Sequence, residues 1–275
     1  VRRYIEPAIG KVRLDRLKAD HVRAMLKGME AEGLSAMTRQ HAYAILHRAL
    51  AVAVKEQRVT RNVAALVEVG QAPKNPHGSL SRAETYAMLD LLSAYADDGR
   101  WDITARYLVA LLCGLRQAEA IGLRWEDVDL EQGVLYVRRS VQWITGKGPI
   151  EQKVKSARSE RTVPLMPPVL YALVKHRESA PEGYVWGGVK PVHASADYQI
   201  WRGLLWSAGC QHHPLHSARS TAANILHEAG APDRVIADIL GHAKFEVTWS
   251  HYLSSEERQL TEAIAGAWRM LDGAR

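Results

Sequence analysis

The sequence predicts a mainly α-helical protein with a small antiparallel β-sheet, divided into two domains. Apolar residues recur at helical spacing through most of the chain, whereas the alternation typical of strands occurs near residues 134–137 and 161–165. A polar segment with several proline and glycine residues, 71–79, separates the two parts. We therefore expect a helical domain at residues 1–74, a linker at 75–79 and a larger mixed α/β domain at 80–275.

The first domain is expected to contain two main helices. Asp20 is the predicted N-cap of a helix that ends near Gly33, and its apolar face consists of Val22, Met25, Leu26 and Met29. A second helix is predicted over residues 38–57, with an apolar face made by Leu46, Ala49, Leu50, Ala53 and Val54.

The second domain is expected to begin with a helix, because Ser81 and Glu84 form a capping-box pattern. An apolar helix over residues 103–112 stops before Gly114, and Arg116 then heads a short helix that contains Glu119. Two strands are predicted at residues 134–137 and 161–165. A basic hairpin tip between them holds Lys153, Lys155 and Arg158.

Beyond residue 166 the pattern is again mostly helical. His216 and Arg219 lie three positions apart at the start of an alanine-rich helix over residues 217–228, so they share one face. The next helix, from residue 232 onward, stops at Gly241 and leaves His242 just past its end. A last helix is predicted over residues 256–271, and we expect Trp201 and Trp206 to lie in the core.

Charge is distributed unevenly between the two domains. Residues 1–74 carry 14 Lys and Arg against 7 Asp and Glu, whereas the remaining residues carry 22 against 23. A small basic domain joined to a near-neutral one suggests that the first domain grips a polyanion, with a solvated basic face as the alternative. No apolar run is long enough to span a membrane, and no signal-peptide pattern opens the sequence. Cys113 and Cys210 are expected as buried thiols in a reducing compartment.

The chain, above all its last third, supplies residue types that can break a phosphodiester without a metal ion. Paired guanidiniums bind the anionic oxygens bidentately, and a tyrosine hydroxyl, with a reference pKa of about 10, needs cationic neighbours and a base to act as nucleophile. The leaving 5′ oxygen requires a proton donor. We assign Arg116 and Arg219 as clamps, Lys153 as general acid with Lys155 as the alternative, Tyr252 as nucleophile, and His216 and His242 as acid–base or hydrogen-bonding groups.

Three blocks of sequence resemble the tyrosine recombinases of the phage-integrase type. Residues 113–120 (CGLRQAEA) with 123–129 (LRWEDVD) resemble the first arginine box of that family, and residues 216–221 (HSARST) resemble its His-x-x-Arg box. Leu240-Gly241-His242, followed ten residues later by Tyr252, resembles its Leu-Gly-His and nucleophile block. Residues 4–10 and 13–17 resemble the start of the core-binding domain of the family. The resemblance therefore covers nearly the whole chain.

This resemblance implies a site-specific DNA recombinase with a helical core-binding domain and a mixed α/β catalytic domain that form a clamp round duplex DNA. It implies a 3′-phosphotyrosyl intermediate, no cofactor, and a homotetramer acting on two DNA sites, with accessory DNA-bending or directionality proteins as further partners. It also implies a cytoplasmic, DNA-associated protein in a bacterial host, and a C-terminal helix that packs on a neighbouring subunit. Packing of that helix on its own domain is the alternative. The arm-type DNA-binding domain of larger members has no counterpart in these residues.

The sequence departs from the family pattern in two places. Ser220 stands where many members have a histidine, and the step from His242 to Tyr252 is one residue longer than in many members. Glu119 is expected to support the site by pairing with a basic neighbour. The histidines at 212, 213 and 216 are interrupted by Pro214 and have no cysteine or carboxylate at ligand spacing, which disfavours a metal site. Two other functions stay open: a type IB topoisomerase-like or telomere-resolving enzyme, and an inactive DNA-binding accessory protein.

Overall fold

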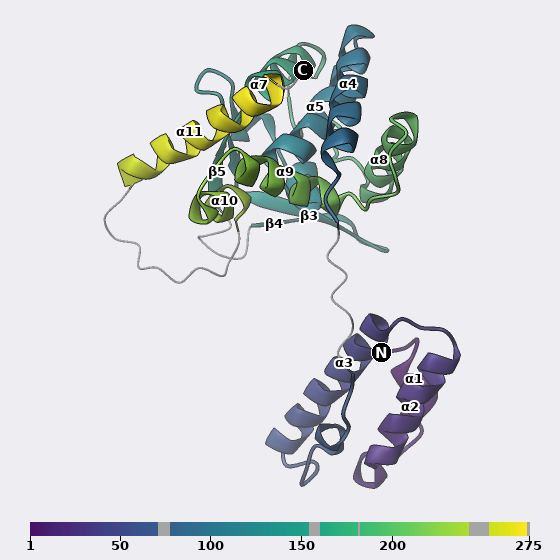
Figure 1. Ribbon diagram of the computed structural model, residues 1–275. Coiled ribbons are helices and arrows are strands. Elements are labelled where there is room, and N and C mark those ends of the chain that lie inside the picture. Colours follow the sequence, from purple (N-terminus) through teal and green to yellow (C-terminus); the bar gives the residue numbers. More distant parts are fainter. Residues whose placement is uncertain (71–77, 154–159, 181, 242–252, 274–275) are drawn as a thin grey trace. The chain divides into compact units, whose positions relative to one another are not determined.

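The computed structural model describes residues 1–70, 78–153, 160–180, 182–241 and 253–273 (Figure 1). The chain divides into two compact units, Val1–Pro76 and His77–Arg275. Helices dominate both units, and every described strand belongs to the second, so the predicted mainly α fold with a small antiparallel sheet is confirmed. Within the described ranges, no helix combines the length and the apolar character that crossing a bilayer requires.

Unit 1 is a small helical unit. It consists of α1 (Ile5–Ile9), the short turn η1 (Leu14–Arg16), α2 (Ala19–Ala31), α3 (Ala36–Lys55) and η2 (Val63–Leu66). Its core is formed by apolar side chains from all three α-helices, among them Ile5, Ile9, Val22, Met25, Met29, Leu46 and Leu50. The predicted faces of α2 and α3 therefore supply this core, except that Ala49 is exposed and Leu26 and Val54 are only half-buried.

Helix α2 starts two residues before the prediction, which made Asp20 its N-cap. Lys18 is the N-cap, and its backbone N–H donates to Nδ1 of His21 at 3.1 Å. Asp20 lies inside the first turn instead, where its carboxylate accepts a bond of 2.6 Å from Arg23. Helix α3 starts two residues before the prediction, because the Ser35 side chain caps it by accepting from the backbone N–H of Thr38 at 3.2 Å.

Unit 2 begins with a series of helical elements, one of which is the buried segment η3 (Val109–Cys113). They are α4 (Arg82–Asp97), α5 (Trp101–Leu108), the π-helical segment η3, α6 (Gln117–Ile121) and η4 (Trp125–Asp127). The predicted capping box is confirmed: Ser81 Oγ accepts from the Glu84 N–H at 3.2 Å, and Glu84 Oε2 accepts from the Ser81 N–H at 2.8 Å. The apolar helix predicted over residues 103–112 is α5 followed by the π-helical segment, and Gly114 ends it in the left-handed region at φ +62°.

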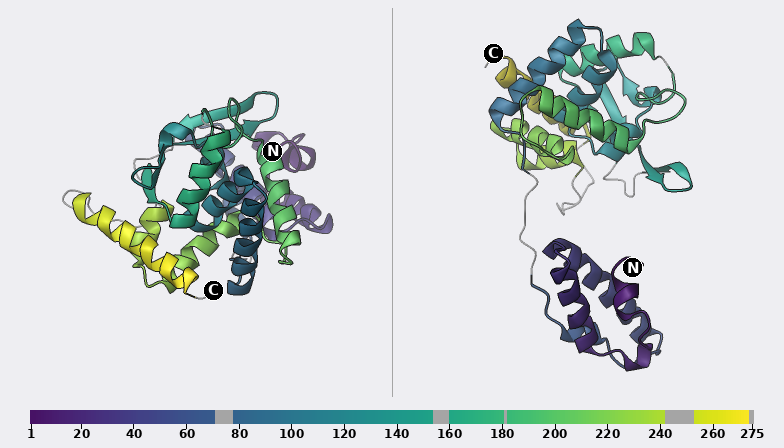
Figure 2. Two further views of the ribbon diagram at one scale, coloured as in Figure 1. Left: turned by 90° about the horizontal axis from the view of Figure 1, so that it is seen from above. Right: turned by 90° about the vertical axis from the view of Figure 1, so that its right-hand side faces the viewer.

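A three-stranded antiparallel sheet has the order β1 (Val128–Asp129), β2 (Val134–Val137), β5 (Arg161–Pro164). The predicted pairing of the second and third of these strands is confirmed, with Val134 opposite Pro164 and Val137 opposite Arg161. A separate hairpin of β3 (Arg139–Ile144) and β4 (Gly148–Lys153) extends from the edge of the unit (Figure 2) and was not predicted. Lys153 is thus the last residue of a strand, whereas Lys155 and Arg158 lie outside the described residues.

The remaining elements of unit 2 are helical, as predicted: α7 (Pro167–Ser179), α8 (Ala194–Ser207), α9 (His216–Glu228), α10 (Asp233–Leu240) and α11 (Leu253–Asp272). Helix α11 lies against α9, α10 and β5 of its own unit (Figure 1). Ile264, Ala267 and Leu271 are buried there, so this helix covers its own domain in the structure.

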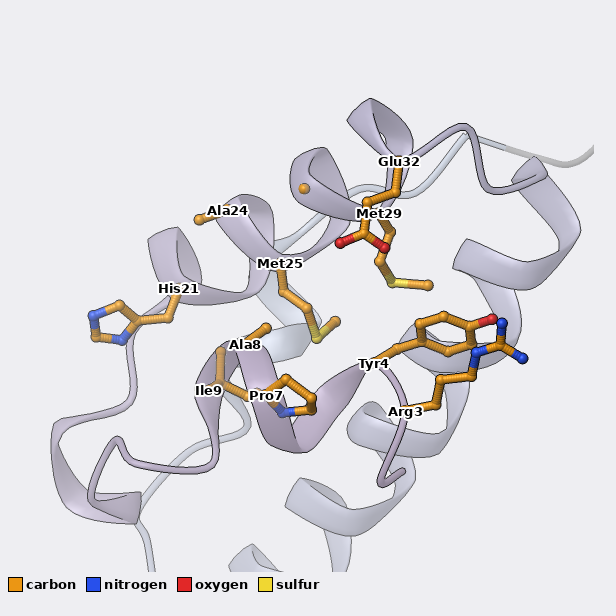
Figure 3. A pocket seen from close by; sticks show the side chains of 11 residues that line it. Arg3, Tyr4, Pro7, Ala8, Ile9, His21, Ala24, Met25, Met29 and Glu32 are labelled. Carbon is orange, nitrogen blue, oxygen red and sulfur yellow. The ribbon is translucent and has the colours of Figure 1, made fainter.

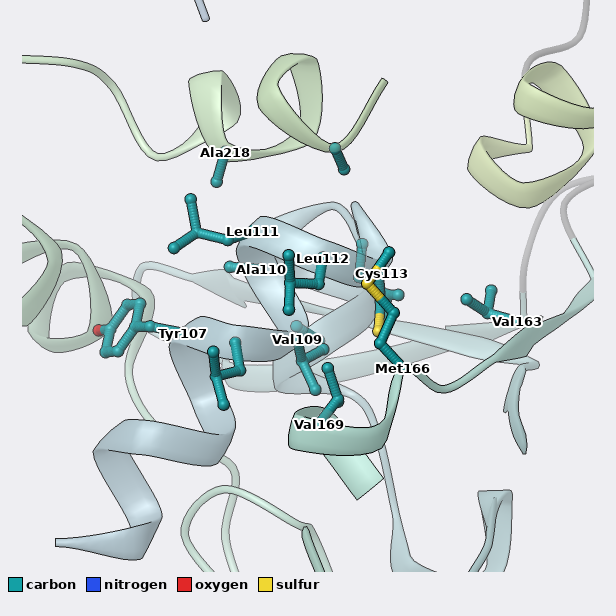
Figure 4. Packing of buried hydrophobic residues seen from close by; sticks show 14 of the residues in the cluster. Tyr107, Val109, Ala110, Leu111, Leu112, Cys113, Val163, Met166, Val169 and Ala218 are labelled. Carbon is teal, nitrogen blue, oxygen red and sulfur yellow. The ribbon is translucent and has the colours of Figure 1, made fainter. Parts of the chain in front are cut away.

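The core of unit 2 is centred on the π-helical segment η3. All five of its residues are buried, and Figure 4 shows them between Ala218 of α9 on one side and Met166 and Val169 on the other. Cys113 belongs to this core, where burial raises the pKa of its thiol to about 12, which keeps the thiol protonated at neutral pH. Packing in the core therefore fixes η3, the segment that directly precedes Gly114 and Arg116 in the sequence.

Candidate active site

Arg116 is the N-cap residue of α6 and faces partly outward. Its side chain is 42% exposed, and its Nη1 lies 2.6 Å from Oε1 of Glu119. The backbone N–H of Arg116 donates to Oε2 of the same carboxylate at 3.0 Å, and Nη2 donates to the Gly241 carbonyl at 3.3 Å. Glu119 thus holds both the backbone and the guanidinium of Arg116, and the exposed part of that guanidinium can reach an external anion.

Glu119 is a buried carboxylate shared by two arginines. Arg161 of β5 also pairs with it, with 2.8 Å between Nη2 and Oε2 and with both side chains about 5% exposed or less. Burial by itself raises the pKa of the Glu119 carboxyl, but the bonds and charge of Arg161 and the bonds from Arg116 outweigh it and lower the pKa. Glu119 is therefore ionised at neutral pH and pairs with both arginines.

Arg219 lies on α9 and is almost completely buried. Its Nη1 donates to the Gly114 carbonyl at 2.7 Å, and its Nη2 donates to the Leu240 carbonyl. Burial, together with the charges of Arg116 and Arg161, lowers the pKa of Arg219 to about 9, so the guanidinium is still a cation at neutral pH. Arg116 and Arg219 thus meet at the same end of α10 although they belong to different helices.

The C-terminal end of α10 is bound by three arginines at three consecutive carbonyls. Arg161 Nε donates to Ile239 O at 2.8 Å, Arg219 to Leu240 O, and Arg116 to Gly241 O. The last carbonyls of a helix lack partners within the helix and form the negative end of its dipole, so cations stabilise them. The three guanidiniums and one carboxylate form a cluster with excess positive charge directly before residue 242, which we call the arginine cluster.

Two glycines allow the backbone to come this close. Gly114 adopts φ +62°, and a Cβ there would collide with Cδ2 of Leu240 and lie 3.1 Å from the Cβ of Ala222. Gly241 adopts φ +69°, and a Cβ there would lie 3.0 Å from Nη1 of Arg161. Both positions favour glycine because the left-handed conformation and the lack of space disfavour any side chain.

The structure places the other predicted site residues as follows. His216 is the first residue of α9 and is exposed, whereas Arg219, three positions later, is buried. Lys153 is exposed at the end of β4, and the nearby Glu151 ties this strand to the domain by accepting from Arg124 Nη2 at 2.9 Å. His242 and Tyr252, predicted as acid–base group and nucleophile, lie outside the described residues.

Arg161 is the site residue that sequence reasoning missed. It is an arginine within a strand in which Val163 and Pro164 are also buried. A charged residue in such a strand requires a buried partner, and this is the signal that could have identified it.

The arrangement does not resemble a metal centre. Among the side chains of the described ranges, no group of three or more His, Cys, Asp or Glu could hold a metal ion. His212 lies 3.1 Å from the Tyr198 hydroxyl, and His213 lies 3.2 Å from Glu84. A hollow of about 350 Å³ in unit 1 lies between α1 and α2 (Figure 3), and its mixed lining includes Met25, Met29, Arg3, His21 and Glu32. The arginine cluster is therefore the better candidate site.

Several curated proteins are similar to this chain. The chain is 30% identical over 187 residues to a "Tyrosine recombinase XerC-like" protein of Caldanaerobacter subterraneus subsp. tengcongensis, covering 59% of this chain and 48% of that protein. It is 24% identical to an "Integrase" of Saccharopolyspora erythraea over 96% of this chain and 75% of that protein. The chain therefore spans about half the length of the first of these relatives.

Solved structures share the fold at low sequence identity. The Tn1549 transposon integrase in complex with transposon right end DNA gives a TM-score of 0.71 at 21% identity, over 94% of this chain and 88% of that one. A lambda integrase dimer bound to a COC′ core site gives 0.63 at 18% identity, over 95% and 84%. The model of the phage integrase family matches residues 81–259, which include the arginine cluster and extend past Tyr252. The chain therefore belongs to the phage integrase family.

Proposed function

We propose that this protein is a site-specific DNA recombinase, an integrase that cuts and rejoins DNA through a 3′-phosphotyrosyl intermediate during integration or excision of a mobile element or phage genome. The observation that carries the proposal is the arginine cluster. Arg116, Arg161 and Arg219 bring three cations to the end of α10, directly before His242. A phosphodiester is an anion that gains charge in its transition state, and preorganised guanidiniums stabilise that charge.

In the proposed reaction the Tyr252 hydroxyl attacks a backbone phosphate, and the 5′ oxygen leaves. Arg116 and Arg219 bind the phosphate oxygens, Lys153 protonates the leaving oxygen, and His216 and His242 act as acid–base or hydrogen-bonding groups. A 5′ hydroxyl from the partner duplex then attacks the phosphotyrosine and restores a phosphodiester. The number of phosphodiester bonds is unchanged, so the reaction needs no nucleotide hydrolysis and no redox cofactor.

We assign unit 1 as the core-type DNA-binding domain and unit 2 as the catalytic domain. Unit 1 carries most of the excess positive charge, which favours contact with the DNA backbone. A homotetramer on two duplexes is proposed by analogy with a lambda integrase tetramer bound to a Holliday junction, a solved structure with a TM-score of 0.64 at 18% identity. Accessory DNA-bending or directionality proteins are further proposed partners. We place the protein on DNA in the bacterial cytoplasm.

The test uses a pool of duplexes of randomised sequence, each with a nick that lets the strand carrying the freed 5′ hydroxyl diffuse away. The protein is expected to form a covalent adduct that survives denaturing gel electrophoresis, and sequencing of the captured DNA gives the preferred site. Tyr252→Phe should form no adduct, and persistence of the adduct in that variant would refute the assigned nucleophile. Relaxation of supercoiled plasmid without a preferred site would favour the topoisomerase-like alternative. Tight binding without any adduct would favour an inactive accessory protein.

A further inference from the structure

A buried carboxylate outside the arginine cluster binds the residue that follows Arg116. Asp197 lies in the first turn of α8 and is 2% exposed. Its Oδ2 accepts from Arg106 Nη2 at 2.8 Å and from Gln117 Nε2 at 2.9 Å. The Tyr107 hydroxyl lies 3.3 Å from Oδ1 and donates to the Asp197 backbone carbonyl at 2.6 Å. Asp197 therefore joins α5, α6 and α8 through a set of buried bonds.

The Gln117 amide is fixed in one orientation by these bonds. Its nitrogen has two hydrogens, and the second is donated to the Ala194 carbonyl at 2.8 Å. Both groups that face the amide are acceptors, so only the nitrogen, and not the amide oxygen, can occupy this position. A carboxylate acceptor also makes the bond stronger than one between neutral groups.

The geometry points to Gln117 as a positioning residue for Arg116, with Asp197 as its anchor. The two α-carbons of consecutive residues are about 3.8 Å apart, so a fixed Gln117 side chain fixes the backbone from which Arg116 extends. Glu119 holds Arg116 from within the site, and Gln117 ties the same turn to α8. This inference rests on the proposed function, since it assumes that Arg116 binds the scissile phosphate.

Arg106 makes this anchor stable without Gln117. Arg106 and Asp197 form an ion pair in which both side chains are 6% exposed or less, and Tyr107 adds its hydroxyl. Removal of the Gln117 amide therefore leaves the Asp197 carboxylate paired with Arg106, with the Tyr107 hydroxyl 3.3 Å from Oδ1. Removal of Arg106 or Asp197, by contrast, would leave a buried charge unpaired and threaten the fold. A substitution at Gln117 can thus change the position of Arg116 without unfolding the protein.

The test compares Gln117→Met, which keeps the length of the side chain and removes both donors, with Gln199→Met on the exposed face of α8 as matched control. Single-turnover adduct formation at saturating protein should be about 10- to 100-fold slower in Gln117→Met, because small misplacements of a catalytic group cost rate steeply. DNA affinity should match that of the control, and Gln117→Met should be fully folded at the assay temperature even though the lost hydrogen bonds lower its midpoint of thermal unfolding. Gln117→Leu removes the same donors and serves if the methionine variant does not fold.

A double-mutant cycle with Arg116→Lys decides whether Gln117 acts through Arg116. We expect the double variant to be no slower than Arg116→Lys alone, since a misplaced lysine has little positioning left to lose. Effects that multiply, or an unchanged rate in Gln117→Met, would overturn the inference. Failure of the wild-type protein to form any adduct would instead reject the proposed function and leave Gln117 as a structural residue.

Discussion

Arg161 and Glu119 form a buried ion pair that joins the strand β5 to the helix α6, with 2.8 Å between Nη2 and Oε2. The two residues are far apart in the sequence, and neither could be buried with its charge alone. The pair therefore connects the sheet to the turn that carries Arg116. The stability of the candidate site should depend on the charge of this one carboxylate.

Glu119→Gln should destabilise the protein at neutral pH by about 3–5 kcal/mol, because it leaves two buried or half-buried guanidiniums without their anion. The folded state lowers the pKa of Glu119 below its ordinary value of 4.5, so the stabilisation is present above that value. It is lost as the pH falls below 4.5 toward the folded-state pKa. Urea unfolding at pH 7 and at pH 4 should therefore show a smaller loss on acidification in Glu119→Gln than in the wild type. Glu131→Gln, at an exposed position, should behave as the wild type at both values.

Arg116→Ala and Arg219→Ala should both abolish measurable cleavage while DNA affinity stays within a fewfold, because the basic domain supplies most of the binding. They should differ in stability. Arg219 is buried, and its removal leaves the carbonyls of Gly114 and Leu240 without their donor, which costs about 2–4 kcal/mol. Arg116 is half exposed, and we expect about 1 kcal/mol for its loss. Denaturant unfolding of the two variants checks the order, and equal losses would contradict it.

Gly114→Ala should be more harmful than an alanine at another left-handed glycine. Gly209 has φ +68° with no atom near its missing side chain, so Gly209→Ala should cost only the backbone strain, about 1–2 kcal/mol. At Gly114 the methyl group would also collide with Leu240, which adds about 1–3 kcal/mol and shifts the end of α10. Comparison of the thermal midpoints and cleavage rates of the two variants tests this. Equal midpoints would show that the contact with Leu240 is not a tight one.

Lys153→Ala should slow cleavage of an ordinary duplex by about 100-fold or more, as expected for loss of a general acid. A duplex in which sulfur replaces the bridging 5′ oxygen needs no proton donor, because a thiolate leaves readily as an anion. Cleavage of this substrate should be nearly the same in Lys153→Ala and wild type. Lys155→Ala is the matched comparison. If the sulfur-containing duplex restores cleavage in Lys155→Ala and not in Lys153→Ala, the general acid is Lys155.

DNA binding should weaken steeply with salt, because the basic unit releases counterions from the DNA backbone. Arg48 is exposed on α3, a helix of 20 residues that contains no Asp or Glu. Arg48→Ala should reduce the slope of log K against log salt by about 1 if this side chain meets a phosphate. Arg13→Ala, which removes an exposed arginine already paired with Asp15, is the comparison. An unchanged slope in Arg48→Ala would place its side chain away from the DNA.

Local features of the fold could be predicted from the sequence, whereas contacts between distant segments could not. Glu119 was expected to pair with a basic neighbour, and Arg116, the N-cap residue of the same short helix, is one of its partners. The partner of Glu119 on β5 gave only the weak signal of a charge in an apolar strand. The hairpin of β3 and β4 was missed because Gly146 and Gly148, which lie at its turn, were interpreted as a break in the chain.

Trp201 and Trp206 show that residue type alone does not predict burial, whereas their spacing along the helix would have separated them. Both were expected in the core, but Trp201 is fully buried and Trp206 is 84% exposed. Five positions along a helix correspond to a rotation of about 140°, so the two rings cannot share one face. The carbonyls that bind the arginine cluster are harder to predict, because every residue has one and the sequence does not mark which are used.

Since main-chain oxygens are identical in every amino acid, the docking of three guanidiniums on α10 places little demand on the side chains at 239 and 240 beyond their fit in the core. Insertion or deletion of one residue within α10 is another matter. It would turn the last carbonyls by about 100° round the helix axis and move them out of line with all three arginines at once. Amino-acid substitutions in α10 should thus be tolerated far better than any insertion or deletion that changes its length.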